Sequence, residues 1–500
     1  MPRIPFLSPL SGLLAGALAV AGFAPFGLWP LPVLSLAYLF WQLSRTSSVR
    51  TGFLAGFAWG LGFFLAGVSW VFVSLWVYGG MPAWLAGLAT FLFCAFLALF
   101  PATVGALQAR WRIAPVLRIL LLLPLAWSVT EWVRGWIFTG FPWLAIGYSQ
   151  VPDGPLAGYA PLFGVHGVSF VLALGAGLLA WAAAARGPLA PRVWAAAAIM
   201  ALGVGGQALR SIQWTTPDGA PTTVALLQGN IPQDMKWQPE RTRATLEAYA
   251  RMAAASPARL IVLPETALPL FESELPAAYR DELIALGRRN GGDVLAGLPT
   301  GSLDGAYYNS VVSFGSAPGQ RYSKVHLVPF GEYIPLKAVW GWVIEVLHIP
   351  LSDFARGAID QRPLAIGGQR VAADICYEDA FGEEIIRPLP EASVLVNVSN
   401  LAWFGDSLAP WQHAQMSQMR ALETGRMMLR ATNTGLTAII DAKGRMLAHL
   451  PPFTAGSLTG EIQGYAGSTP YVRWGNAPVL ALWGILGIVL LAATLYPRAP

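Results

Sequence analysis

Three segments of the chain place reactive side chains at the ends of apolar runs. LIVLPETALP contains Glu265, YSKVHLVPFGEYIP contains Lys324 and Glu332, and ADICYEDAFGE contains Cys376 and Glu378. A thiol becomes a strong nucleophile only as the thiolate, so a base must take its proton and a cation must stabilise the charge on the attacked carbonyl. Glutamate, lysine and cysteine can fill these roles together. The three segments therefore point to covalent acyl transfer through Cys376.

Each of these residues also has a simpler interpretation when taken alone. Glu265 could be a charge at the start of a helix, Lys324 a solvated lysine, and Cys376 a small buried hydrophobic residue. The combination favours chemistry, because the sequence offers no Gly-rich phosphate loop and no GxSxG nucleophile elbow.

The metal-binding residue types are thinly distributed. The only other cysteine, Cys94, lies in the apolar run LATFLFCAFLALF, and the five histidines are scattered without a CxxC or HExxH pattern. We therefore expect no metal, no organic cofactor and no disulfide between Cys94 and Cys376.

The elements that must position these residues alternate between strands and helices. Helical composition is found at 239–255, 276–290 and 410–432, and the apolar runs between them, several of them rich in branched residues, predict strands. This alternation predicts an α/β domain with helices layered on sheets. The expected strands are 224–231, 259–266, 291–299, 308–314, 370–378, 393–400 and 437–444.

The rest of the chain has the composition of a membrane protein. Of all residues 55% are apolar and 12% are charged, against roughly 25% charged in a soluble domain. A helix needs about 20 apolar residues to cross a bilayer. About eight spans are expected, at 7–24, 27–44, 52–77, 84–107, 116–133, 160–185, 193–209 and 477–496.

These spans divide the chain into three parts. Residues 1–209 are expected to form seven membrane helices, 210–476 a catalytic domain, and 477–500 an eighth helix with a short tail. The first span resembles a signal peptide in its small residues, but the six spans that follow favour a retained helix.

Arginine is distributed unevenly between the expected loops, which predicts the orientation. With a cytoplasmic N-terminus, the inside segments contain most of the basic residues, whereas the outside loops before the soluble domain contain only Arg134. In a bacterium this places both termini in the cytoplasm and 210–476 on the periplasmic side of the inner membrane. The net charge of +5 is small and gives no reason to expect a nucleic-acid partner. The inside residues are Arg3, Arg45, Arg50, Arg110, Arg112, Arg118, Arg186, Arg192 and Arg498.

Two aromatic stretches of the expected catalytic domain are candidates for contact with lipid. Residues 333–355 include Trp342 and are apolar but interrupted by proline and charge, so they favour either a core helix with a flanking loop or an arm at the lipid interface. The stretch LAWFG contains Trp403 and Phe404. Both stretches are expected to line a lipid entrance.

Together, Glu265, Lys324 and Cys376 resemble the Glu-Lys-Cys triad of the nitrilase superfamily. The multi-span frame with QGNIPQDMKW, LPETALP, KVHLVPFGEYIP and ICYE further resembles the apolipoprotein N-acyltransferase family, over essentially the whole chain. The resemblance implies a four-layer αββα sandwich, with Glu265 as general base and Lys324 as oxyanion partner. It further implies that Glu332 and Glu378 hold Lys324, and that Trp237 and Tyr377 shape an acyl-binding cavity.

The reaction that this resemblance implies has two steps. Cys376 takes an acyl chain from a membrane phospholipid, and the α-amine of a diacylglyceryl-cysteine apolipoprotein then takes it from the thioester. A membrane-anchored amidohydrolase, with water as acceptor, is the nearest alternative. A transporter or receptor is a more distant one, because polar residues inside the spans are scarce.

Overall fold

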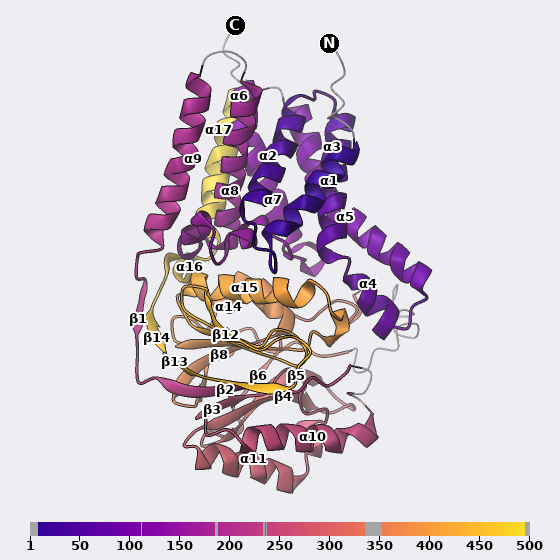
Figure 1. Ribbon diagram of the computed structural model, residues 1–500, viewed down its shortest axis with the longest axis vertical. Helices are drawn as coiled ribbons and strands as arrows, with labels where there is room; N and C mark the ends of the chain where they lie inside the picture. Colours follow the sequence, from indigo (N-terminus) through magenta and orange to yellow (C-terminus); the bar gives the residue numbers. More distant parts are fainter. Residues whose placement is uncertain are drawn as a thin grey trace. The chain divides into compact units, whose positions relative to one another are not determined.

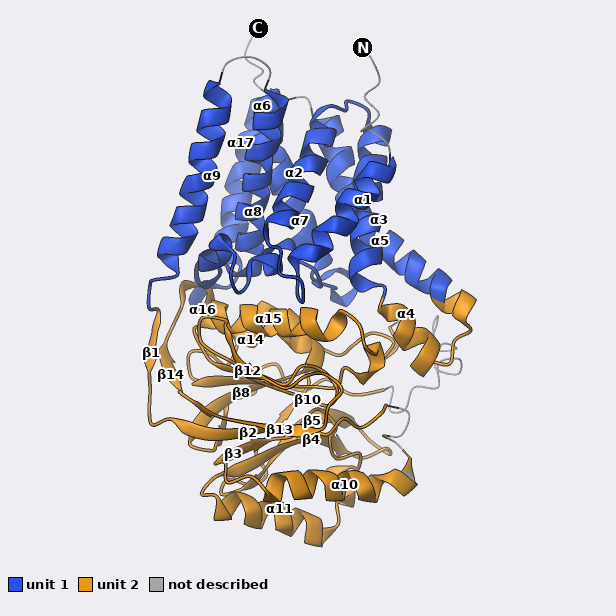
Figure 2. Cartoon of the chain, viewed as in Figure 1, with its two compact units in different colours: residues 1–69, 87–213, 473–500 blue, residues 70–86, 214–472 orange. Residues whose placement is uncertain are grey.

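The fold is taken from a computed structural model, which describes residues 9–111, 113–185, 189–233, 236, 238–335 and 353–495. Trp237, Trp342 and most of the aromatic stretch 333–355 lie outside the described residues. The chain divides into two compact units (Figure 2), each described below by itself. Unit 1 comprises residues 1–69, 87–213 and 473–500, and unit 2 comprises 70–86 and 214–472.

Unit 1 is helical (Figure 1), so the expected helical membrane part is confirmed. Six of the described helices are long and apolar enough to cross a membrane by length and composition. Proline in the first turn, where a missing N–H costs no hydrogen bond, begins α2 and α9, and the Ser48 hydroxyl caps α3. The main helices are α1 (Pro9–Ala19), α2 (Pro30–Ser44), α3 (Val49–Val68), α5 (Ala83–Arg110), α7 (Leu123–Arg134), α8 (Ala160–Ala184), α9 (Ala190–Leu209) and α17 (Ala477–Leu495).

Shorter helical segments connect these helices. The helix α6 (Pro115–Leu117) and the π-helical turn η4 (Arg118–Leu122) lead directly into α7, which together give the span expected at 116–133. Three 3₁₀ segments, η5 (Ile137–Thr139), η6 (Ile146–Gln150) and η7 (Pro155–Tyr159), fill the connection from α7 to α8. A further one, η2 (Val20–Gly22), continues α1.

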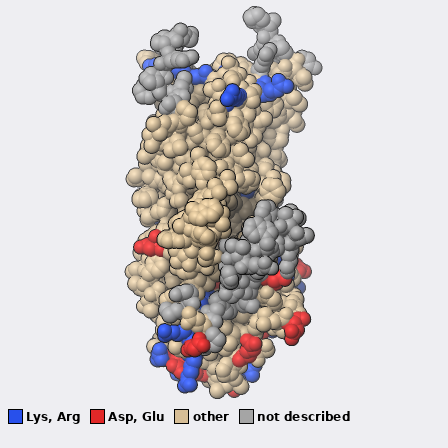
Figure 3. All heavy atoms as spheres, turned by 90° about the vertical axis from the view of Figure 1, so that its right-hand side faces the viewer, with Lys and Arg blue, Asp and Glu red and all other residues tan. Residues whose placement is uncertain are grey.

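Glycine permits the close packing of α1 against α3. A Cβ atom on Gly16 would lie 1.9 Å from the backbone oxygen of Trp59, and one on Gly62 equally close to that of Leu13. Helices in a membrane are not driven together by the hydrophobic effect, and they often associate through such small residues. The flank of unit 1 visible in Figure 3 is almost free of charged side chains, and basic ones gather near one end, as membrane helices require.

The described residues of unit 2 form two six-stranded sheets and a small two-stranded one. The first sheet has the order β13-β2-β3-β4-β5-β6 and the second the order β12-β11-β10-β9-β8-β7. The first comprises β2 (Thr222–Gln228), β3 (Leu260–Val262), β4 (Asp293–Gly301), β5 (Tyr307–Gly315), β6 (Arg321–Ser323) and β13 (Gly456–Ile462). The second comprises β7 (Leu364–Ile366), β8 (Gln369–Ile375), β9 (Val394–Ser399), β10 (Met428–Thr432), β11 (Ala438–Ile440) and β12 (Met446–His449). β1 (Thr215–Pro217) pairs with β14 (Tyr465–Gly467).

The two sheets pack face to face, and helices cover their outer faces (Figure 1). Alternate residues of β2 separate the layers: Val224 and Leu226 face the second sheet, whereas Ala225 and Leu227 face the helices. Such alternation gives each sheet two buried faces. The expected four-layer αββα sandwich is therefore confirmed. Its covering helices are α10 (Pro239–Ala254) and α11 (Ala277–Arg289) on one side, and α14 (Gly382–Ile385) and α15 (Ala409–Thr424) on the other.

The helix expected over 410–432 is shorter than predicted. α15 ends at Thr424 because Gly425 adopts a left-handed conformation with φ of 62°, and the chain then enters strand β10. The apolar run MMLRAT is compatible with a helix or with a strand, because a short buried strand lacks the alternation of apolar and polar residues that would distinguish it from a helix.

One segment of the expected membrane part belongs to unit 2. The span expected at 52–77 is helical as α3 only to Val68, and residues 70–86 group with the sandwich. This segment contains α4 (Val71–Val73) and the π-helical turn η3 (Ser74–Tyr78). It packs against the stretch that contains Trp403 and Phe404.

Candidate active site

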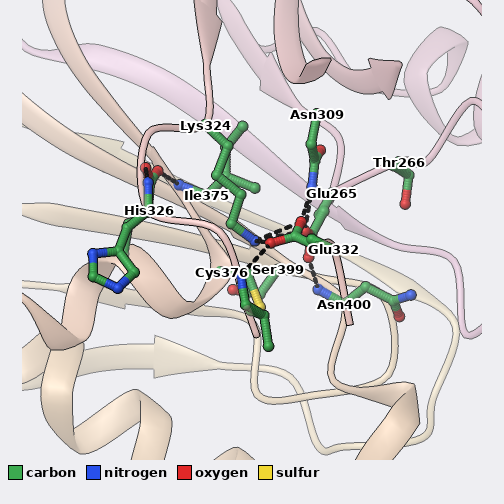
Figure 4. Close-up of polar contacts among 12 residues, drawn as sticks. Glu265, Thr266, Asn309, Lys324, His326, Glu332, Ile375, Cys376, Ser399 and Asn400 are labelled. Carbon is green, nitrogen blue, oxygen red and sulfur yellow. Dashed lines mark hydrogen bonds and ion pairs between the residues drawn. The ribbon is translucent and has the colours of Figure 1, made fainter. Parts of the chain in front are cut away.

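Glu265, Lys324 and Cys376 converge at one place in unit 2 although they follow different strands (Figure 4). Glu265 comes after β3, Lys324 directly after β6, and Cys376 directly after β8. β3 is parallel to its neighbours β2 and β4, and β8 is parallel to β9. The carboxyl ends of parallel strands meet at one edge, where α/β folds collect their functional groups.

The Lys324 ammonium lies between two carboxylates. Its Nζ is 2.9 Å from Glu332 and 3.4 Å from Oε1 of Glu265. Lys324 itself is buried, and its backbone N–H donates to the carbonyl of Asn309 at 2.8 Å. Burial alone would lower the pKa of Lys324, but the charges of Glu332 and Glu265 outweigh it and raise the pKa. The ammonium is therefore permanently charged, as an oxyanion partner must be.

Besides Lys324, two hydrogen-bond donors fix Glu265. Asn309 Nδ2 donates to Oε1 at 2.7 Å, and the backbone N–H of Asn400 donates to Oε2 at 2.8 Å. Burial would raise the pKa of Glu265, but Lys324, Lys236 and these hydrogen bonds hold it below the usual range. The carboxyl group is ionised and able to accept a proton.

Cys376 lies at a sharp turn of the backbone. Its φ is 56°, in the left-handed region that residues with a side chain rarely adopt. The carbonyl oxygen of Cys376 accepts hydrogen bonds from Asn397 Nδ2 at 3.1 Å and from His413 Nε2 at 3.0 Å. Burial and the charge of Glu265 raise the pKa of the Cys376 thiol. The resting thiol is therefore protonated, and a base would have to remove its proton before the sulfur could act as a nucleophile.

Glu378 links the lysine segment to the cysteine segment. It accepts from the backbone N–H groups of Val325 at 2.6 Å, His326 at 3.0 Å and Ile375 at 2.7 Å. The Tyr322 hydroxyl donates to it at 3.0 Å. Its carboxylate therefore positions Lys324 through the backbone of the next residues, whereas Glu332 contacts the ammonium directly. Burial raises the pKa of Glu378 to about 7, against these hydrogen bonds.

Three further sequence-predicted residues, Tyr377, Trp403 and Phe404, are among those that the structure describes. Tyr377 is buried, with its ring 5.9 Å from that of His326 and 5.1 Å from that of Phe381. The rings of Trp403 and Phe404 contact Tyr78 and Trp70 of the segment 70–86, at 6.0 and 4.6 Å between centroids. Within the described residues, no group of three His, Cys, Asp or Glu side chains is arranged to hold a metal ion.

Sequence reasoning missed several polar residues of this site. Asn309 bridges Glu265 and Glu332, Lys236 contacts the Glu265 turn, and His413 holds the Cys376 carbonyl. Asn309 stood out as the only amide in the apolar run YNSVVSF, and Lys236 lies within the motif QGNIPQDMKW. Nothing in the sequence around His413 marked it.

Known proteins share both parts of this chain. Residues 15–178 match the model of the apolipoprotein N-acyltransferase N-terminal domain, and residues 223–471 match that of the carbon-nitrogen hydrolase. Among solved structures, an amidase from Nesterenkonia is similar with a TM-score of 0.38 and 19% identity, over 54% of this chain and 98% of that chain.

Apolipoprotein N-acyltransferases from three bacteria are similar over nearly the whole length. The one from Nitrosomonas europaea is 52% identical, over 96% of this chain and 95% of the relative. Those from Chromobacterium violaceum and Methylococcus capsulatus are 47% and 49% identical over 96% of this chain, and over 93% and 95% of their own.

The fold and the site define a membrane protein with a nitrilase-like catalytic unit. Because these relatives are similar over both units and not over the sandwich alone, the family can be stated more narrowly. The chain belongs to the apolipoprotein N-acyltransferase family.

Proposed function

We propose that this protein transfers an acyl chain from a membrane phospholipid, through a thioester on Cys376, to the N-terminal α-amine of a diacylglyceryl-cysteine apolipoprotein. The observation that supports this most is the meeting of a base, a permanent ammonium and a thiol in one buried cluster. That cluster belongs to a chain whose other unit is built of membrane helices. Lipid substrates explain why the two parts occur together.

In the first step the Cys376 sulfur attacks the ester carbonyl of the phospholipid. Glu265 takes the thiol proton, and Lys324 stabilises the oxyanion of the tetrahedral intermediate, helped by a backbone N–H near Cys376. When the intermediate collapses, the C–O bond to glycerol breaks and protonated Glu265 gives its proton to the departing oxygen. The products are the acyl-thioester and a lysophospholipid.

In the second step the neutral α-amine of the apolipoprotein attacks the thioester. Glu265 accepts a proton from the attacking nitrogen, and Lys324 again stabilises the oxyanion. The C–S bond then breaks, and Glu265 returns the proton to the Cys376 sulfur. The amide product leaves with the enzyme in its starting protonation state. Water must be kept from the thioester between the steps, because hydrolysis would waste it.

The supporting residues act by position. Glu332 and Glu378 hold Lys324, while Trp237 and Tyr377 shape the acyl-binding cavity. Trp342, Trp403 and Phe404 line the lateral entrance for lipid. The contacts of Trp403 and Phe404 with the segment 70–86 support this role, since that segment continues from a membrane helix.

The domain limits and the location belong to the same proposal. Residues 1–209 and 477–500 form the membrane part in the bacterial inner membrane, with both termini in the cytoplasm. Residues 210–476 form the catalytic domain on the periplasmic side, where an outer-leaflet lipid reaches Cys376. The arginine-rich inside segments support this orientation.

The test is intact-mass analysis of the purified protein after incubation with phospholipid, beside Cys376→Ala. We expect an added acyl mass on the wild type only. Hydroxylamine and a diacylglyceryl peptide with a free α-amine should remove it, and water should remove it only slowly. Rapid loss in water would instead indicate a hydrolase. An adduct on Cys376→Ala, or none on the wild type, would contradict the role of Cys376.

A further inference from the structure

A second buried lysine lies next to the base, and the mechanism above does not use it. Lys236 is 4% exposed. Its Nζ donates to the backbone oxygen of Glu265 at 3.1 Å and to the hydroxyl of Thr266. A carbonyl and a hydroxyl are neutral partners, so among the described residues no counter-ion accepts a hydrogen bond from this ammonium. The described carboxylate whose charge acts on it is Glu265.

Lys236 is held in place by the segment that follows β2. Gln233 Oε1 accepts from Asn400 Nδ2 at 2.7 Å, and the backbone of Ile231 exchanges two hydrogen bonds with the Asn433 side chain, at 2.9 and 2.7 Å. Asn400 is also the residue whose N–H donates to Glu265. Asn400 therefore contacts both the segment that contains Lys236 and the proposed base, Glu265.

Counting the charges of the cluster shows what Lys236 contributes. Lys324 is shared between Glu265 and Glu332, which leaves one negative charge unbalanced. Asn309 Nδ2 donates to both carboxylates, at 2.7 and 2.9 Å, and so keeps them close together. Two carboxylates that share a site cannot both stay ionised without enough positive charge, and one takes up a proton instead. Lys236 supplies a second positive charge beside these two carboxylates.

We infer that Lys236 is a positioning residue whose charge keeps Glu265 ionised beside Glu332, so that Glu265 is free to accept the thiol proton at neutral pH. The inference rests on the proposed function, since it assigns Glu265 the role of base. It concerns the charge of Lys236 and not its volume.

The free-energy cost of burying the Lys236 ammonium distinguishes a role for its charge from a role for its volume. Burial lowers the pKa of Lys236 to about 8, against the charge of Glu265. Keeping this ammonium charged in a dry site therefore costs free energy. Methionine would fill the same space without that cost, so packing alone does not call for a lysine.

Other charged groups near Glu265 also favour or oppose its ionisation. Glu332 opposes the ionisation of Glu265 because it is a second carboxylate hydrogen-bonded to the same amide. Lys324 favours it. Among the described residues, the charged and titratable groups that act on or contact Glu265, Lys324 or Cys376 include Lys236, Glu332, Glu378, Arg430 and His413.

The experiment measures the rate of thioester formation on Cys376 against pH, by intact mass, with full-length protein in detergent and phospholipid. The readout is the midpoint of the acid limb, which reports the ionisation of Glu265. In Lys236→Met we expect this midpoint to rise by about one pH unit, since an opposite charge nearby shifts a carboxyl pKa by roughly 1–3 units. On that limb the rate then falls about tenfold. Lys236→Arg, which keeps the charge, should retain the wild-type midpoint.

A charge-matched pair completes the test. Glu332→Gln removes a negative charge next to Glu265, so its midpoint should fall below that of the wild type. The double variant Lys236→Met/Glu332→Gln loses one charge of each sign, and its midpoint should return towards the wild-type value even though its rate is lower. It also replaces Lys236→Met if the single variant does not fold.

The outcomes separate the two proposals. No adduct on the wild type at any pH overturns the proposed function. An adduct on the wild type, with the same midpoint in every variant and only the height of the profile changed, overturns the inference about Lys236 and leaves the acyltransferase in place.

Discussion

At the scale of single residues, the nucleophile depends on a backbone conformation that must be held by its neighbours. A non-glycine residue in the left-handed region costs of order 1 kcal/mol or more. Cys376 has a φ of 56°, and its carbonyl is held by Asn397 and His413. Both donors belong to a buried network below the turn. The other members of this network are Asp379, Ser417 and Arg430.

The network fixes the protonation state of His413. Arg430 donates to His413 Nδ1 at 2.7 Å, and a guanidinium can only donate. Nδ1 is therefore the acceptor, and the proton of the neutral ring lies on Nε2, which faces the Cys376 carbonyl and Asp379. Burial and the charge of Arg430 lower the pKa of His413. The ring is a neutral donor at neutral pH.

Replacement of His413 should therefore slow the nucleophile. In His413→Leu the Cys376 carbonyl loses a donor and Arg430 loses an acceptor, so we expect at least a roughly tenfold slower acylation and a loss of about 2–4 kcal/mol of stability. His413→Gln offers both an amide donor and an acceptor and serves as the matched control. Acylation rates are measured by intact mass and stability by thermal unfolding.

A loss of stability in His413→Leu with an unchanged acylation rate would contradict this role. An equal loss of acylation rate in His413→Leu and His413→Gln would also contradict it, because glutamine can replace both hydrogen bonds of the histidine ring. The rate difference between leucine and glutamine is therefore the informative quantity.

At the scale of elements, the contact between the segment 70–86 and the stretch LAWFG brings aromatic residues together. Trp70 packs against Phe404, and its indole N–H donates to Gln412 at 3.2 Å, while Tyr78 packs against Trp403. The segment contains the exposed side chains of Trp76, Val77 and Trp84. Exposed aromatic and apolar residues are at home in a lipid interface.

Trp403→Ser should impair the use of lipid without damaging the chemistry. We expect thioester formation from phospholipid to fall about tenfold or more, because the entrance loses an apolar aromatic wall. Alkylation of Cys376 by iodoacetamide, a small water-soluble reagent, should stay within about twofold of wild type. Leu303→Ser is the matched control, since Leu303 is an exposed apolar residue of the same unit, at 66% exposure, and belongs to no described aromatic contact. Equal losses in both reactions would point to a damaged site instead of a damaged entrance.

The strands and the triad could be predicted where the local apolar pattern of the sequence and the chemistry of the residues at its end indicate the same site. Strands such as 224–231 and 370–378 are apolar runs, and the triad residues end such runs. β10 was missed because Gly425 ends α15 in a stretch where apolar residues continue without a break. Lys236 and His413 could not be found, because their roles depend on contacts made between segments distant in the sequence. The break after Val68 was missed for a related reason, since the apolar run continues past it while the chain leaves unit 1.

At the scale of the whole molecule, the distribution of charged side chains distinguishes a part suited to a lipid environment from a part suited to water. The visible surface of unit 1 has basic side chains near one end, whereas unit 2 displays both signs of charge (Figure 3). The sequence expectation agrees with this distribution, since basic residues lie in the short segments between spans. Because basic loops prefer the cytoplasm, we predict that this end of unit 1 faces the cytoplasm.

The orientation can be tested with single cysteines. Cys94 is fully buried, so Cys376→Ala gives a background with little labelling of its own. Asp304→Cys introduces a thiol at an exposed turn of unit 2, and Ser47→Cys introduces one in the exposed connection between α2 and α3. If the catalytic domain is periplasmic, a membrane-impermeant maleimide added to spheroplasts should label the cysteine at 304 and spare the one at 47 until the inner membrane is permeabilised. The opposite pattern would place Cys376 in the cytoplasm, where a thioester site could not meet lipids of the outer leaflet. It would therefore contradict the orientation and the proposed route of the substrates together. Labelling of both positions before permeabilisation would show leaky spheroplasts, which a cytoplasmic marker enzyme detects in the same sample.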